Sequence, residues 1–206
     1  MQLLTLLATV IGLSQSAAAV SKTEARATEQ SSSSGCPNIS PGPATTFQLA
    51  SLLPLSPLTD PISTEAIRNT LAIYVFAIDG RNWDAMARVF APNARANYSA
   101  PLGVSNGVAN ITASISSGIN TFAGTQHRYG SQYINICSLS SAISVTYFEA
   151  SHYFVPDLGP AVVDDNQVLY ANGRYEDTWA RQIDGSWKIV NRNLVYMGPL
   201  ILDSTT

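Results

Sequence analysis

The sequence predicts an α+β fold in which helices cover one face of a curved antiparallel sheet. Apolar residues recur at helical spacing between residues 63 and 119, and after Gly124 the period changes to two, with many β-branched and aromatic residues. Helices followed by a run of long strands are typical of the α+β class. We expect three N-terminal helices packed on a concave sheet that encloses a pocket.

The helices are predicted from apolar stripes and from the residues that bound them. The first begins with Ser63 as its N-cap and Glu65 in its first turn, where a carboxylate suits the helix dipole, and it ends at Gly80. A turn over 79–82 separates it from the second helix. An extended segment at residues 95–99 precedes the third. The predicted helices span residues 63–79, 83–90 and 107–119.

The strands are predicted from alternation. Asp184-Gly185 is a hairpin signal between the last two strands, and Ser138 to Ser141 should turn between the first two. Trp83, Trp179 and Trp187 are expected in the core, because large aromatic side chains dominate core burial. The predicted strands span residues 126–137, 142–155, 167–182 and 187–198.

Composition limits the class of partner. The chain has 206 residues, of which 46% are hydrophobic and only 12% charged, so it is the size of one domain with a real core. The formal net charge is −3, and no basic stripe is present. Binding to nucleic acid releases counterions through Lys and Arg. We therefore expect no nucleic-acid partner.

Residues 1–19 are predicted to be a secretory signal peptide. The stretch from Leu3 to Leu13 is uncharged and leucine-rich, and the small residues Ala17 and Ala19 suit signal peptidase. The mature chain should then start near Val20 and be extracellular. Eleven apolar residues are too few for a transmembrane helix, which needs about 20, so no membrane association is expected after cleavage.

The segment 20–61 is a low-complexity arm rich in Ser and Pro, without sustained periodicity, and we expect no core from it. Residues 62–200 then form the domain, and 201–206 a C-terminal tail. Cys36 and Cys137 are an even count in an oxidising compartment, which predicts one disulfide. Two unrelated thiols are the alternative.

Three sequons agree with secretion. The acceptor pattern for N-glycosylation occurs at Asn38, Asn97 and Asn110. Attached glycans would supply solubility to a surface that is poor in charge.

A series of short motifs, each weak alone, occurs in an order and spacing that resembles the SnoaL-like branch of the nuclear transport factor 2-like superfamily. This is the cone-shaped α+β fold that also includes scytalone dehydratase and limonene epoxide hydrolase. The resemblance covers about residues 65–196. Its carriers are Asp79-Gly80-Arg81-Asn82-Trp83-Asp84, Val89-Phe90-Ala91-Pro92, Asn97-Tyr98, Thr125-Gln126-His127, Gly173-Arg174-Tyr175-Glu176-Asp177 and Asp184-Gly185-Ser186-Trp187-Lys188-Ile189.

The resemblance to scytalone dehydratase implies roles for three residues. Asp79, Tyr98 and His127 match positions where that enzyme is thought to use an Asp-supported His as acid/base and Tyr residues to polarise substrate through water. Ile78 stands where the enzyme has a second Tyr, and Asp157 where it has its second catalytic His. These two departures argue against scytalone as the substrate.

The residues themselves allow the same chemistry. His127 is one of two histidines, and a side chain that titrates near neutrality is the usual choice for moving a proton. Asp79 could hold its imidazole in one tautomer and stabilise the protonated form, as a buried carboxylate does in a catalytic triad. The alternative is a turn role for Asp79 and a wall position for His127.

Five residues, Tyr98 among them, are candidates for substrate binding. His152 alternates in register with Phe148, Ala150 and Phe154, which places it on their face of the strand. On strand 167–182, Tyr175 and Asp177 share a face from which either side chain could reach a ligand. For Asp177, the alternative to a ligand contact is an ion pair with Arg192 on the adjacent strand. The substrate-binding candidates are Tyr74, Tyr98, Tyr129, His152 and Tyr175.

Cofactor chemistry has no signal in the sequence. There is no Gly-x-Ser-x-Gly elbow, no Gly-rich dinucleotide loop, no Walker-type Lys and no His spacing typical of a metal site. We therefore expect no cofactor and no metal.

These observations leave three functional hypotheses. The leading one is a secreted, cofactor-independent lyase or isomerase, dehydratase-like, acting on a small, largely apolar or aromatic compound with His127 and Asp79 as catalytic residues. The second is a non-catalytic binding protein for a small hydrophobic ligand. The third is a homodimeric interaction module whose sheet face packs on a partner.

Overall fold

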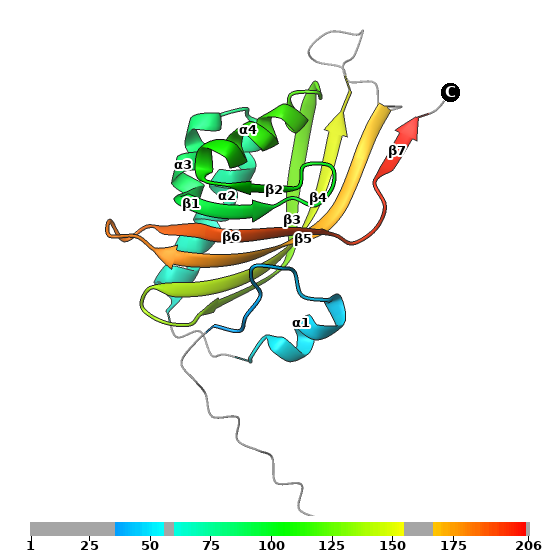
Figure 1. Ribbon diagram of the computed structural model, residues 1–206. Coiled ribbons are helices and arrows are strands. Elements are labelled where there is room, and N and C mark those ends of the chain that lie inside the picture. Colours follow the sequence, from blue (N-terminus) through cyan, green and yellow to red (C-terminus); the bar gives the residue numbers. More distant parts are fainter. Residues whose placement is uncertain (1–35, 56–59, 155–166, 205–206) are drawn as a thin grey trace, which may run out of the picture. The chain divides into compact units, whose positions relative to one another are not determined.

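The computed structural model describes residues 36–55, 60–154 and 167–204. The predicted signal peptide, residues 20–35 of the arm and Asp157 lie outside the described residues. The predicted α+β class is confirmed: the helices after residue 60 gather on one side of a strongly bent, unclosed sheet (Figure 1). Within the described residues, no helix is long and apolar enough to cross a membrane.

In the described part of the chain, seven strands form one sheet in the order β2-β1-β6-β5-β4-β3, and β7 pairs with β5 beyond the end of β6. All pairs are antiparallel except β1 with β6, which is parallel. The four long strands lie within a few residues of their predicted ranges. The strands are β1 (Phe90–Asn97), β2 (Val104–Asn106), β3 (Gly124–Ile136), β4 (Ser141–Tyr153), β5 (Gln167–Arg181), β6 (Trp187–Tyr196) and β7 (Ile201–Ser204).

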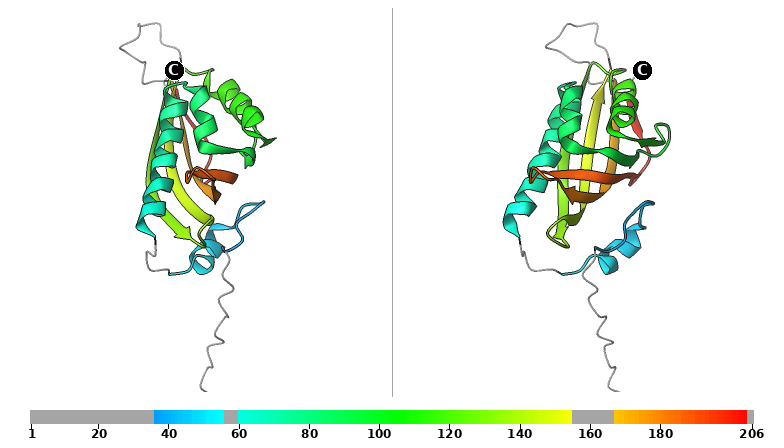
Figure 2. Two further views of the ribbon diagram at one scale, coloured as in Figure 1. Left: turned by 90° about the vertical axis from the view of Figure 1, so that its left-hand side faces the viewer. Right: turned by 60° about the vertical axis from the view of Figure 1, so that its left-hand side comes forward.

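The helices α2 (Pro61–Asp79), α3 (Met86–Val89) and α4 (Val108–Ile119) lie over the concave side of the sheet, as the two turned views show (Figure 2). The prediction of Ser63 as N-cap was wrong. Asp60 caps α2, and its carboxylate accepts hydrogen bonds from the backbone N–H and the hydroxyl of Ser63 at 2.9 and 2.6 Å. Pro61 then occupies the first turn, where its missing N–H has no consequence.

The second predicted helix is shorter than expected. Residues Trp83–Ala85 form a 3-10 turn before the four-residue α3, and Phe90 already begins β1. The apolar spacing over these residues is helical, but only two short turns fit between α2 and the first strand. The third helix agrees with its prediction to within one residue.

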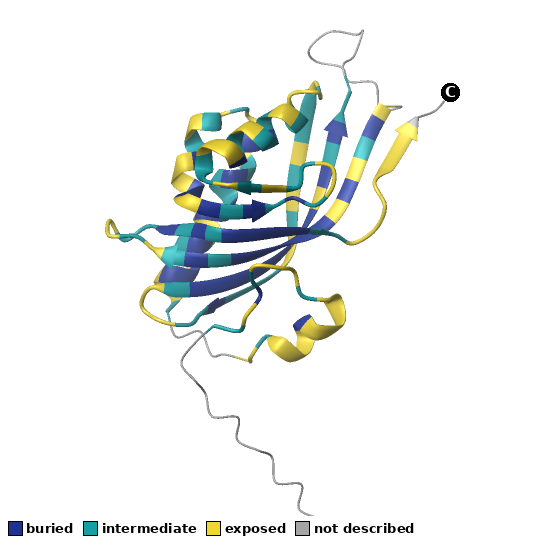
Figure 3. Cartoon of the chain, in the orientation of Figure 1, coloured by how far each residue is buried: buried dark blue, intermediate teal, exposed yellow. Residues whose placement is uncertain are grey.

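The core lies between α2 and the concave face of the sheet. The buried side of α2 carries Ile67, Leu71 and Tyr74, each at most 1% exposed. Trp179 and Trp187 are also buried, as expected, whereas Trp83 packs at the margin of the core. Burial is continuous along the middle strands and falls off at the sheet ends (Figure 3).

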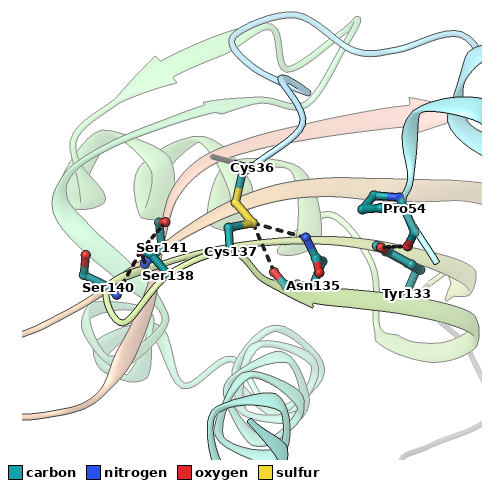
Figure 4. Close-up of a disulfide and its surroundings, with 8 residues drawn as sticks. All are labelled: Cys36, Pro54, Tyr133, Asn135, Cys137, Ser138, Ser140 and Ser141. Carbon is teal, nitrogen blue, oxygen red and sulfur yellow. Dashed lines mark hydrogen bonds between the residues drawn. A yellow bond between two sulfur atoms is a disulfide. The ribbon is translucent and has the colours of Figure 1, made fainter. Parts of the chain in front are cut away.

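The described part of the arm packs on the sheet, contrary to the expectation that it builds no core. Cys36 and Cys137 form a disulfide at the end of β3, and further along that strand Tyr133 donates a hydrogen bond to the carbonyl of Pro54 (Figure 4). Ile39 and Leu49 are buried. The disulfide and hydrogen bonds between backbone groups of the arm and side chains of the domain hold this segment, and neither leaves a periodic signal in a sequence.

The arm also covers a buried ion pair on the sheet face that points away from α2. Arg174 Nε lies 2.9 Å from Glu176 Oε1, and both side chains are at most 1% exposed. The backbone N–H of Ala44 donates to Glu176, while Arg174 donates to the Ala44 carbonyl and to Thr46. Thr46 begins α1 (Thr46–Leu52), which lies apart from the other helices (Figure 1).

Candidate functional site

A cavity of about 290 Å³ lies between α2, α4 and the concave sheet face. Most of its wall is apolar. The polar side chains in the wall are two imidazoles, four phenols and the hydroxyl of Thr121. Residues that line it include Tyr74, Ile78, Tyr98, Leu102, Ile115, Ile119, Phe122, His127, Phe148, Ala150, His152, Leu169, Ala171, Tyr175, Leu194, Tyr196 and Leu200.

The structure brings four of the five substrate-binding candidates to this cavity. Tyr74 comes from α2, Tyr98 follows β1, His152 lies on β4 and Tyr175 on β5. The fifth, Tyr129, does not line it. Its ring packs 6.3 Å from that of Tyr175, and its hydroxyl donates to the carbonyl of Leu71 at 3.3 Å. Tyr129 therefore lies deeper under α2, although it shares a strand face with His127.

Asp79 and His127 are in direct contact. Asp79 is the last residue of α2, and its Oδ1 lies 2.7 Å from His127 Nδ1. Its Oδ2 accepts the backbone N–H of His127 at 2.9 Å, and Oδ1 also accepts the hydroxyl of Thr125 at 2.9 Å. The side chain of His127 is only 5% exposed. The C-terminus of a helix and the start of β3 thus fix both partners.

This contact pattern determines where the proton resides. Hydroxyl and backbone N–H groups donate to Asp79, so an acceptor-only carboxylate fits the site and a protonated acid does not. Burial opposes ionisation of Asp79, but hydrogen bonds from His127 and Thr125 outweigh it and hold the pKa of this carboxyl below its usual value. The neutral imidazole of His127 then carries its proton on Nδ1, and Nε2 keeps a lone pair.

His152 is a second imidazole in the cavity wall. Its Nδ1 lies 3.1 Å from the carbonyl oxygen of Leu169, which can only accept, so Nδ1 carries a proton and Nε2 of the neutral ring is an acceptor. The rings of His127 and His152 stand perpendicular, with centroids 5.5 Å apart. Burial lowers the pKa of His152 despite the Leu169 hydrogen bond, which favours the neutral ring.

The phenols of the cavity supply hydroxyl groups to its wall. The hydroxyls of Tyr74 and Tyr98 lie 3.1 Å apart. One of them donates to the other, which leaves the second hydroxyl proton available to a ligand. Burial raises the pKa of Tyr98 and Tyr175 well above the usual value of a phenol. These side chains can donate hydrogen bonds but do not act as bases at neutral pH.

A buried ion pair supports these phenols from behind. Arg192 and Asp177 are fully buried and joined by two hydrogen bonds of 2.7 and 2.8 Å. Asp177 therefore forms the ion pair with Arg192 that was the alternative to a ligand contact. The guanidinium carbon lies 4.2 and 4.1 Å from the ring centroids of Tyr74 and Tyr175. This arrangement fixes two rings of the cavity wall through cation–π contacts.

Sequence reasoning missed Arg81 and Thr125, which surround Asp79. The sequence indicates only a turn at Arg81 and only a motif beside His127 at Thr125. Asp-Gly-Arg is an ordinary turn sequence, so nothing local indicates that the guanidinium folds back toward the preceding helix. The one available signal was the joint presence of both segments in the family pattern.

The three sequons differ in exposure. Asn38 and Asn110 are exposed, and Asn97 is half-buried at the end of β1. The side-chain amide of Asn110 donates to the carbonyl of Asn106 at 2.9 Å. N-glycosylation stays a prediction for all three.

Comparisons with known proteins agree with this architecture. An uncharacterized protein of Mycobacterium tuberculosis is 27% identical over 142 residues, which is 69% of this chain and 88% of the relative. A solved structure of a candidate scytalone dehydratase from Novosphingobium aromaticivorans has a TM-score of 0.58 at 20% identity, covering 70% of this chain and 89% of that one.

A solved structure of a hexachlorocyclohexane dehydrochlorinase from Novosphingobium barchaimii is also similar. Its TM-score is 0.57 at 15% identity, with 68% of this chain and 89% of the other covered. Likeness at these identities establishes the shared fold. The SnoaL-like domain family matches residues 62–193, which include α3, α4, all of α2 except its first residue, the dyad of Asp79 and His127 and most of the cavity. The chain therefore belongs to the SnoaL-like domain family.

Proposed function

We propose that the chain is a cofactor-independent lyase or isomerase for a small, largely apolar or aromatic compound. The observation that carries this proposal is the 2.7 Å contact between His127 Nδ1 and the Asp79 carboxylate, with the same imidazole lining an apolar cavity. A carboxylate-supported imidazole beside open space is the arrangement that general acid/base catalysis requires. Two structural neighbours, a candidate scytalone dehydratase and a dehydrochlorinase, are named for elimination reactions.

The proposed step is a proton abstraction. Nε2 of His127 takes a proton from an acidic C–H of the substrate, and the released electron pair forms a C=C bond. Asp79 stabilises the resulting imidazolium. In a lyase, the neighbouring carbon–leaving-group bond breaks and the leaving group departs with its electron pair. In an isomerase, the substrate already holds a neighbouring double bond, whose electron pair moves to its far carbon as the new C=C bond forms, and that carbon takes the proton back from the imidazolium.

The other polar groups of the cavity would bind and orient the substrate. The free hydroxyl proton of the Tyr74–Tyr98 pair can donate to a substrate oxygen that gains negative charge. His152 offers an acceptor through Nε2. Phe122 and Phe148 would pack on an apolar ring. A ligand with one acceptor, one donor and an apolar body matches this inventory.

The test is a conversion screen. The purified protein is incubated with metabolite extracts, and substrates consumed and products formed are followed by mass spectrometry. We expect a product that differs from its precursor by loss of a small neutral molecule, or an isomer of unchanged mass. A compound that is retained by the protein but never converted would favour the second hypothesis, a binding protein. Its apolar cavity would serve that role equally.

Secretion is part of the same proposal. If the signal peptide is cleaved after Ala19, protein recovered from culture medium should begin at Val20. N-terminal sequencing reads this directly, and deglycosylation with a mass measurement counts the occupied sequons. Protein found only inside the cell with Met1 intact would contradict the processing.

A further inference from the structure

Arg81 makes an unusual number of contacts for a residue in a turn. Its Nη1 donates to the carbonyl of Asp79 and to Thr125 Oγ1, both at 3.0 Å, and lies 3.3 Å from the carbonyl of Ile78. Its Nη2 donates to the carbonyls of Ile119 and Phe122, at 3.4 and 3.2 Å. One guanidinium therefore joins the end of α2, the turn after α4 and the start of β3.

The backbone of Arg81 indicates that this position is under constraint. Its φ is 55°, in the left-handed region that non-glycine residues rarely adopt. Such conformations are energetically unfavourable, persist only where the surroundings impose them, and gather at functional sites. Gly80 precedes it, and a side chain there would lie 2.9 Å from the carbonyl of Phe76. The turn thus returns Arg81 toward Asp79.

The direction of the hydrogen bonds around Thr125 follows from chemistry. A guanidinium has no acceptor, so in its contact with Arg81 the Thr125 hydroxyl must accept. The single proton of that hydroxyl is then left to donate to Asp79 Oδ1, at 2.9 Å. The opposite direction is unavailable. Arg81 thereby sets the rotamer of a hydroxyl that holds the carboxylate.

We propose that Arg81 and Thr125 form a hydrogen-bond relay that positions the Asp79 carboxylate against His127 Nδ1. This inference rests on the proposed function, in which His127 is the acid/base. Neither residue lines the cavity, so both are positioning residues. The relay fixes Oδ1 while the backbone N–H of His127 fixes Oδ2, and the carboxylate cannot rotate away from the imidazole.

A substrate-free experiment tests the relay. The chain has two histidines, so protein labelled with ¹⁵N-histidine gives two ring spin systems, and a His152→Gln variant assigns them. The measured quantity is the solvent-exchange rate of the proton on His127 Nδ1. We expect exchange at least about tenfold faster in Thr125→Val, because the loosened carboxylate releases this proton more often. Thr125→Ser, which keeps the hydroxyl, should match the parent.

Arg81 is tested with a matched arginine. Arg81→Gln should accelerate the same exchange, whereas Arg128→Gln, at an exposed arginine of β3, should not. If Arg81→Gln does not fold, the comparison of Thr125→Val with Thr125→Ser still tests the relay. Exchange in a folded Thr125→Val protein that equals the parent rate would overturn the relay, and this holds whether or not a substrate is ever found.

Once a converted substrate is available, a double-mutant cycle separates positioning from general stability. Thr125→Val should lower kcat about 10- to 100-fold with KM nearly unchanged. In the Asp79→Asn background the same substitution should lower kcat no further, because the relay acts through that carboxylate. An equal loss in both backgrounds would show that Thr125 does not act through Asp79 and would reject the relay.

Discussion

Replacing His127 with alanine is expected to lower turnover by about 10²–10⁴-fold, the usual contribution of a positioned general acid/base. Among the residues that the structure describes, this imidazole is the base that the Asp79 carboxylate contacts in the cavity. Affinity for substrate should change much less, because the apolar wall and the Tyr74–Tyr98 pair remain. Steady-state kinetics with an identified substrate measures both quantities.

A second variant, His127→Asn, distinguishes a loss of catalysis from a loss of folding. In His127→Asn the side-chain amide nitrogen can occupy the place of Nδ1 and keep the hydrogen bond to Asp79, while no group replaces Nε2. Both variants should therefore lose kcat to the same extent, and His127→Asn should keep the parent's unfolding midpoint. Full turnover in a folded His127→Asn protein would end the acid/base proposal.

The binding hypothesis makes the opposite prediction for the same variants. Without a chemical step, loss of the imidazole changes only the dissociation constant, by about 1–3 kcal/mol if a buried partner is left unsatisfied. Calorimetry on the parent and on His127→Asn distinguishes the two. A change in affinity without any conversion supports a carrier, and a change in kcat at constant affinity supports an enzyme.

The fold was predictable where a segment is long and periodic. The four long strands were found because alternation over ten or more residues outweighs local noise, and α2 and α4 because each carries a continuous apolar stripe. The three-residue β2 and four-residue β7 are too short for any period to be counted. β2 exists because it pairs with β1 across a loop, and β7 because it pairs with β5, which is distant in sequence.

The site was predictable only as far as residue chemistry and the family pattern reach. Asp79 and His127 are 48 residues apart, and their meeting depends on how β3 passes the end of α2. Alternation correctly put His152 and Tyr175 on the cavity face. Tyr129 was a substrate-binding candidate without such an argument. It shares a strand face with His127, but a shared face does not give the depth of a side chain, and α2 covers that position.

Replacing Asp79 with asparagine is expected to change which nitrogen of His127 carries the proton. Three donor groups meet the carboxylate, and an amide offers only one oxygen. If its nitrogen took the Oδ2 place, it would face the backbone N–H of His127, which cannot accept. The amide oxygen therefore stays at that N–H, and the amide nitrogen donates to Nδ1. The ring proton moves to Nε2.

That tautomer has no lone pair on the nitrogen that serves as the base. Turnover should consequently fall by on the order of 10³–10⁴-fold, as expected when a supporting carboxylate is lost and the wrong tautomer results. The ¹⁵N shifts of the two ring nitrogens report the exchange of proton positions directly. Asp84→Asn, which removes an exposed charge five residues away, is the matched control and should alter neither shifts nor kcat.

The same substitution has a signature in the pH dependence of stability. The pKa of Asp79 is lower in the folded chain than in the unfolded one, where an aspartate side chain has a pKa of about 3.9. Such a group stabilises the fold above that pH, and its contribution is lost as the pH falls through the folded pKa. The free energy of unfolding of the parent should exceed that of Asp79→Asn at pH 5, and the difference should shrink toward pH 2. A difference that stays constant across this range would show that Asp79 is not held as an ionised carboxylate, and the assignment of the base to His127 Nε2 would fail with it.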